Sequence, residues 1–111
     1  MKKLAVILLI ILILLTGCSG KVTMKNVSKQ PNFRGIVTEV NEHSILVKVN
    51  EDEDEIRSSD LMNVSLSMEI EDSLREFNVG DKVRVYYDGK IAESYPAQIN
   101  KVYTIILENP S

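Results

Sequence analysis

Apolar residues occupy every second position in two segments of this chain, 62–70 and 83–87. A period of two places one set of side chains on a single face of a β-strand, whereas a helix would scatter them. Shorter β-rich runs predict two more strands at 33–40 and 45–49, joined by the polar turn 41–44. The chain is therefore constrained to fold as a protein of short, half-buried strands.

The remaining segments complete an all-β prediction. Gly35 is expected at a bulge or a close approach of two strands, and residues 72–77 at a short helical turn. Asp88-Gly89 suits a type I′ hairpin, with 91–95 returning along the strand before it. Pro96 then breaks the strand, and 99–107 finishes the sheet. Five or six short strands predict a small OB-like barrel; an antiparallel sandwich or roll is the alternative.

The N-terminus has the pattern of an export signal. Lys2 and Lys3 precede twelve consecutive aliphatic residues, 4–15, which as a helix reach only about 18 Å. The run ends in Leu15-Thr16-Gly17-Cys18, which resembles the lipobox of bacterial lipoproteins. We expect residues 1–17 to be a signal peptide removed before Cys18, whose thiol carries a diacylglyceryl group. A short uncleaved membrane anchor is the alternative.

Charge divides the mature chain into two parts. Residues 18–32 are small and polar with three lysines and no acid, which predicts a flexible basic tether behind the lipidated end. Residues 33–111 form the predicted β domain, with sixteen acids against eight bases, a net of −8. Such a domain is expected to stand off an anionic membrane and to bind no nucleic acid. One cysteine and one histidine exclude a disulfide framework and the common zinc sites.

Three motifs carry a resemblance to a known family. Phe33-Arg34-Gly35, the turn 79–83 and above all the block 86–98, Tyr-Tyr-Asp-Gly-Lys-Ile-Ala-Glu-Ser-Tyr-Pro-Ala-Gln, resemble the small YobA-like lipoproteins of Bacillus-type bacteria. The resemblance covers the domain without the tether. It implies a Gram-positive cell, an outward-facing lipoprotein and an OB-like β domain, and it implies no activity, because that family has no known function.

Polar and aromatic side chains gather around the predicted hairpin and the proline bend. The candidate binding residues are Tyr87, Asp88, Glu93, Tyr95 and Gln98. In a binding site, the two tyrosines are expected to wall a pocket, with Glu93 and Gln98 orienting the ligand. The alternative is a turn held by its own side chains, because Pro96 leaves backbone groups to be satisfied.

Two functions follow from these features. The first is a lipid-anchored, non-enzymatic binding module on the extracytoplasmic face of the cell membrane, contacting an envelope protein, a peptide or a small molecule. The second is a cation-responsive or structural envelope protein acting through the acidic run 51–55, although that run lacks the glycine and ligand spacing of an EF-hand loop. Self-association is a third possibility. No nucleophile, phosphate-loop or HExxH motif occurs, so no catalytic residue, cofactor or specific metal site is predicted.

Overall fold

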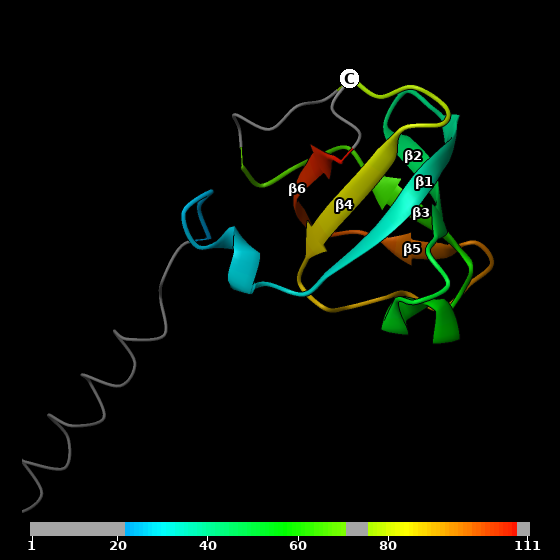
Figure 1. Ribbon diagram of the computed structural model, residues 1–111, viewed down its shortest axis with the longest axis horizontal. Coiled ribbons are helices and arrows are strands. Elements are labelled where there is room, and N and C mark those ends of the chain that lie inside the picture. Colours follow the sequence, from blue (N-terminus) through cyan, green and yellow to red (C-terminus); the bar gives the residue numbers. More distant parts are fainter. Residues whose placement is uncertain (1–21, 71–75, 109–111) are drawn as a thin grey trace, which may run out of the picture.

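The alternating segments become strands of one sheet. The computed structural model describes residues 22–70 and 76–108 of the chain (Figure 1). The strands are β1 (Asn32–Val40), β2 (Ser44–Val49), β3 (Leu61–Ser65), β4 (Lys82–Tyr87), β5 (Ala97–Ile99) and β6 (Val102–Leu107). Two 3₁₀ turns accompany them, η1 (Val27–Lys29) and η2 (Asp54–Arg57). The predicted all-β class is confirmed.

The six strands form an open, mixed sheet. Their order is β5-β3-β2-β1-β4-β6, and only the β3–β5 pair is parallel. A single bridge between Met68 and Val102 links the segment after β3 to β6. The sheet is not closed by a ladder, so the expected OB-like barrel is not confirmed, whereas the sandwich or roll alternative is compatible with this arrangement.

The core is the concave side of the sheet, where the alternating residues meet. Val83, Val85 and Tyr87 of β4 are each 3% exposed or less. The rings of Phe33 and Tyr87 pack edge to face with their centroids 5.6 Å apart, a favourable geometry for two aromatic quadrupoles. Burial of apolar side chains from all six strands supplies the main stabilisation of the fold.

Gly35 lies at a close approach of strands. A Cβ atom at this position would overlap the side chain of Val47 and lie 2.5 Å from the backbone oxygen of Lys48. Glycine is therefore required for β1 to pair with β2 at this distance. The bulge predicted at the same residue is located elsewhere, since the register shift falls between Val37 and Glu39.

The third predicted strand is shorter than the alternation indicated. β3 ends at Ser65, because its partner β2 begins at Ser44, the residue paired with Ser65; the Leu66 N–H still donates to the carbonyl of His43, 2.9 Å away. The chain bends there, and Met68 reaches β6 instead of extending β3. The predicted helical turn 72–77 lies largely outside the described residues.

The predicted hairpin after β4 does not form. Gly89 takes the expected positive φ of 85°, but the neighbours of β4 are β1 and β6. β6 buries Val102 and Ile105 almost completely, whereas residues 92–95 are exposed. The more apolar strand therefore occupies the position next to β4. The predicted final strand 99–107 is divided into β5 and β6.

The predicted flexible tether is partly folded. Within 22–32, the Val27 N–H donates to the Thr23 carbonyl at 2.8 Å, and Val27 is only 3% exposed. The carbonyl of Pro31 accepts a hydrogen bond of 3.0 Å from the N–H of Tyr87, at the end of β4. This segment is therefore attached to the sheet instead of linking to it loosely. The predicted signal peptide 1–17 and Cys18 lie outside the described residues.

Candidate functional site

The acidic run is bound to the sheet through Arg34. The backbone N–H of Arg34 donates to Glu53 at 2.6 Å, and its guanidinium donates to Asp52 at the same distance. The hydrogen bond to Asp52, followed by the negative charges of Asp52 and Glu53, raises the pKa of the Arg34 guanidinium. Asp52 and Glu53 of the run therefore have specific partners, and its second half forms η2.

A third carboxylate of the acidic run, that of Glu55, bonds a residue of the core. It accepts a 2.7 Å hydrogen bond from the hydroxyl of Tyr87. Burial, followed by this bond, raises the pKa of Tyr87 well above its usual value. Only 3% of the surface of Tyr87 is exposed. Tyr87 therefore packs beneath η2 and does not form the wall of an accessible pocket.

This hydrogen bond predicts a dependence of stability on pH. Tyr87 ionises near pH 10 in the unfolded chain and only at higher pH in the folded one, so its contribution is complete below pH 10 and is lost above it. Relative to Tyr87→Phe, the wild type is expected to lose about 1.4 kcal/mol of unfolding free energy between pH 9 and pH 11. Urea unfolding at both pH values measures this.

The control for this prediction is Tyr86→Phe, which leaves the Tyr87–Glu55 bond intact and is expected to follow the wild type. Curves of stability against pH that run parallel for the wild type and Tyr87→Phe would show that the Tyr87 hydroxyl is not bonded as described.

The loop between β4 and β5 is held in place by backbone and side-chain bonds. Ala92 and Gln98 exchange two backbone hydrogen bonds, of 2.9 and 3.1 Å. The Gln98 side chain accepts from Asn63 of β3 at 2.9 Å. Asp88 accepts from the backbone N–H of Lys90 at 3.0 Å. Asp88 therefore stabilises the loop as the turn alternative expected, whereas the Gln98 side chain bonds a side chain of β3 and not a backbone group of the turn.

Tyr95 is the exposed aromatic residue at the tip of this loop. Its side chain is 71% exposed, yet its hydroxyl donates to Asp60 at 3.0 Å. That hydrogen bond is the first cause of a raised pKa for Tyr95. Glu93 is also exposed, and no other described residue engages its carboxylate. We refer to Asp60, Glu93, Ser94 and Tyr95 as the Tyr95 surface.

The two regions that the sequence treated as separate sites are joined in the structure. Tyr87 contacts Glu55 in η2, and Tyr95 contacts Asp60 just before β3. Asp60 and Asn63 were not recognised as site residues. Each lies 35 positions from its partner, and no local motif marks such a pairing.

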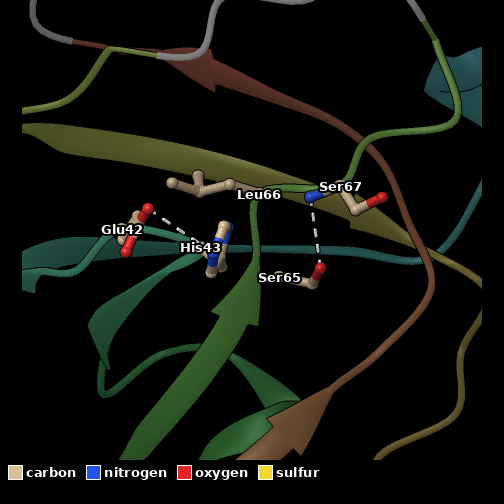
Figure 2. Close-up of a pocket in the computed structure, with 5 residues that line it drawn as sticks. All are labelled: Glu42, His43, Ser65, Leu66 and Ser67. Atoms are coloured by element: carbon tan, nitrogen blue, oxygen red, sulfur yellow. Dashed lines mark hydrogen bonds and ion pairs between the residues drawn. The ribbon is translucent and has the colours of Figure 1, made fainter.

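A shallow hollow of about 490 Å³ lies at the turn between β1 and β2 (Figure 2). In it, Nε2 of His43 is 3.8 Å from a carboxylate oxygen of Glu42, with both side chains almost fully exposed. The N–H of Ser67 donates to Ser65 at its rim. A contact this exposed to solvent contributes little, and the residues drawn offer no buried or activated nucleophile.

In the described parts of the chain, no group of three or more His, Cys, Asp or Glu side chains is arranged to hold a metal ion. Across residues 22–70 and 76–108, no helix has the length and apolar character needed to cross a membrane.

The fold and the site define a small all-β domain of six strands that presents an exposed, hydrogen-bonded tyrosine on a fixed loop. The chain belongs to the family described as "Protein of unknown function (DUF3221)", which matches residues 34–107. These bounds extend from the third residue of β1 to the last residue of β6. No curated protein and no solved structure matches the chain.

Proposed function

We propose that this protein is a lipid-anchored, non-enzymatic interaction module on the extracytoplasmic face of the cell membrane. Cys18 is its lipid attachment site, and the Tyr95 surface contacts an envelope protein, a peptide or a small molecule. We also propose that the chain is one of the YobA-like lipoproteins, because it carries the three motifs at 33–35, 79–83 and 86–98.

The lipid anchor is supported by the order of residues at the N-terminus. A basic start, an aliphatic run too short to span a bilayer easily, two small residues and a cysteine follow one another at lipobox spacing. Two acyl chains on one residue hold a protein stably, because each buried CH₂ contributes about 0.8 kcal/mol.

The single observation that carries the binding role is that Tyr95 is exposed and yet is held by a hydrogen bond. An exposed aromatic ring usually loses conformational freedom on binding, and that loss weakens association. The hydrogen bond to Asp60 already fixes the hydroxyl end of Tyr95. Much of the conformational freedom of the ring is therefore already lost in the free protein, and binding removes less of it. Tyrosine is also enriched among the residues that dominate binding energies.

Photo-crosslinking in intact membranes tests this role. A benzophenone amino acid is placed at Glu93, beside Tyr95, in one full-length variant and at Glu53 in another, so that the Tyr95 hydroxyl keeps its bond to Asp60. We expect a discrete adduct from position 93 and none from position 53. Lys48, an exposed residue on the outer face of β2, provides a background position.

An adduct from position 53 alone would contradict the proposal and support the acidic-run alternative. Equal adducts from positions 93 and 48 would indicate random collision and would also contradict it. The structure gives the alternative less support, because Asp52, Glu53 and Glu55 already accept hydrogen bonds from Arg34 and Tyr87.

A further inference from the structure

The N-terminal segment fixes where the lipid anchor joins the domain. Four residue steps separate Cys18 from Val22, the first described residue, and a fully extended chain spans only about 14 Å over that length. From Val22 to Lys29 the chain forms a turn and η1, and at Pro31 it joins the sheet through the hydrogen bond from the Tyr87 N–H. A lipid on Cys18 therefore holds one particular side of the domain close to the bilayer.

That side is where β1 begins and β4 ends. Beyond the bond between Pro31 and Tyr87, the ring of Pro31 lies against Gly89, since a Cβ atom on this glycine would be 3.3 Å from it. Lys29 precedes Pro31 by two residues, and Lys90 follows Gly89. The two lysines come from distant parts of the sequence and are brought to the same side by this contact.

The exposed side chains on this side suit a lipid surface. Lys25, Lys29 and Lys90 are all exposed, and Met24 is an apolar side chain with 51% of its surface exposed. The acid nearest to Lys90 in the sequence is Asp88, and its carboxylate accepts a hydrogen bond from the backbone N–H of Lys90. Lysines attract anionic headgroups while an exposed apolar side chain enters the boundary of the acyl region.

The acidic run 51–55 reaches the same end of the sheet, because β2 is antiparallel to β1 and its end pairs with the start of β1. Three of its carboxylates already have partners: Asp52 and Glu53 accept hydrogen bonds from Arg34, and Glu55 accepts one from Tyr87. In Figure 1, η1 lies to the left of β4 and η2 to the right of it. The lysines of the η1 side are therefore separated from the run by the width of this end of the sheet.

We propose that Met24, Lys25, Lys29 and Lys90 form a docking surface for anionic phospholipid headgroups. The proposal rests on the lipid anchor of the proposed function and adds an orientation to it. The domain lies on the bilayer by its η1 side, in contrast to the expectation from net charge that it stands off. The Tyr95 surface, on the loop that leads into β5, then remains open to partners.

Fluorescence quenching tests the orientation with the full-length, lipidated chain in vesicles. A fluorophore is attached to a cysteine introduced at Ser28 in η1 or at Ser58 beside η2, both exposed. The quencher is a nitroxide on the lipid headgroup. In phosphatidylglycerol-containing vesicles we expect stronger quenching at position 28 than at 58, and Lys90→Gln is expected to reduce the docked-to-undocked ratio about fivefold.

The matched control is Lys48→Gln, which removes the same charge from the outer face of β2 and is expected to leave the ratio unchanged. About 0.5 M salt, which shortens the Debye length to about 4 Å, is expected to act like Lys90→Gln. A ratio that is equal in phosphatidylcholine and phosphatidylglycerol, and insensitive to Lys90→Gln, would overturn the proposal.

Failure of the lipid anchor gives a different result. An unlipidated chain would contradict the proposed function, and the docking surface would then be tested by co-sedimentation of the full chain with the same vesicles. Binding weakened by Lys90→Gln and retained by Lys48→Gln would support the docking surface. Absence of binding would contradict it.

Discussion

Cys18→Ala is expected to abolish lipid labelling completely and to leave the chain as an unprocessed precursor. The thiol of Cys18 is the only cysteine sulfur in the chain, so no other atom can take its place in a thioether. Growth with radioactive palmitate followed by electrophoresis measures both effects, since the precursor keeps residues 1–17. This is an all-or-none result.

Ser19→Ala is the control for lipidation, because it alters the next residue without removing the thiol. It is expected to label and to be processed like the wild type. Palmitate on the Cys18→Ala protein, or an unlabelled wild type with its leader intact, would contradict both the lipobox interpretation and the proposed location.

Phe33→Ala is expected to cost about 3–5 kcal/mol of unfolding free energy, the usual range for deleting a large buried ring. Phe33 is fully buried in β1 and packs edge to face on Tyr87. Its loss leaves a cavity and removes the support of the ring that bonds Glu55. Urea denaturation of the full chain measures the change.

Phe33→Leu keeps most of the volume and is expected to cost less than about 1.5 kcal/mol. A similar loss for the two variants would show that the position does not lie in a tightly packed core. A loss below about 1 kcal/mol for Phe33→Ala would contradict the described packing of β1 on β4.

Local alternation predicted the strands that bury one face. β2 and β4 lie within one residue of their predicted bounds, because Ile45, Val47 and Val49, and likewise Val83 and Val85, point into the core. The same pattern overestimated β3. Its continuation through Met68 still alternates, but β3 ends where its partner β2 begins, and Met68 pairs with Val102 instead, which no local pattern reveals.

The sequence predicted some residues of the candidate site but not which residues they contact. Tyr95 and Glu93 are exposed, as a binding surface requires, while Tyr87 is buried and Asp88 and Gln98 hold backbone or a neighbouring strand. The partners Glu55 and Asp60 lie 32 and 35 residues away from the tyrosines they bind. Contacts between residues so far apart depend on the order of the strands in the sheet, which the spacing of apolar residues along the chain does not determine.

The position of β1 in the sheet has a consequence for the order of folding. β1 comes first in the chain, yet it lies between β2 and β4, and β4 in turn needs β6 from the C-terminal end. A polypeptide emerging from the ribosome therefore cannot complete this sheet until nearly all of its residues are available. The pairing of β1 with β4 joins residues as far apart as Asn32 and Arg84, 52 positions, and such non-local contacts slow folding. A product truncated before β4 would leave β1 with one edge unpaired and open to proteases.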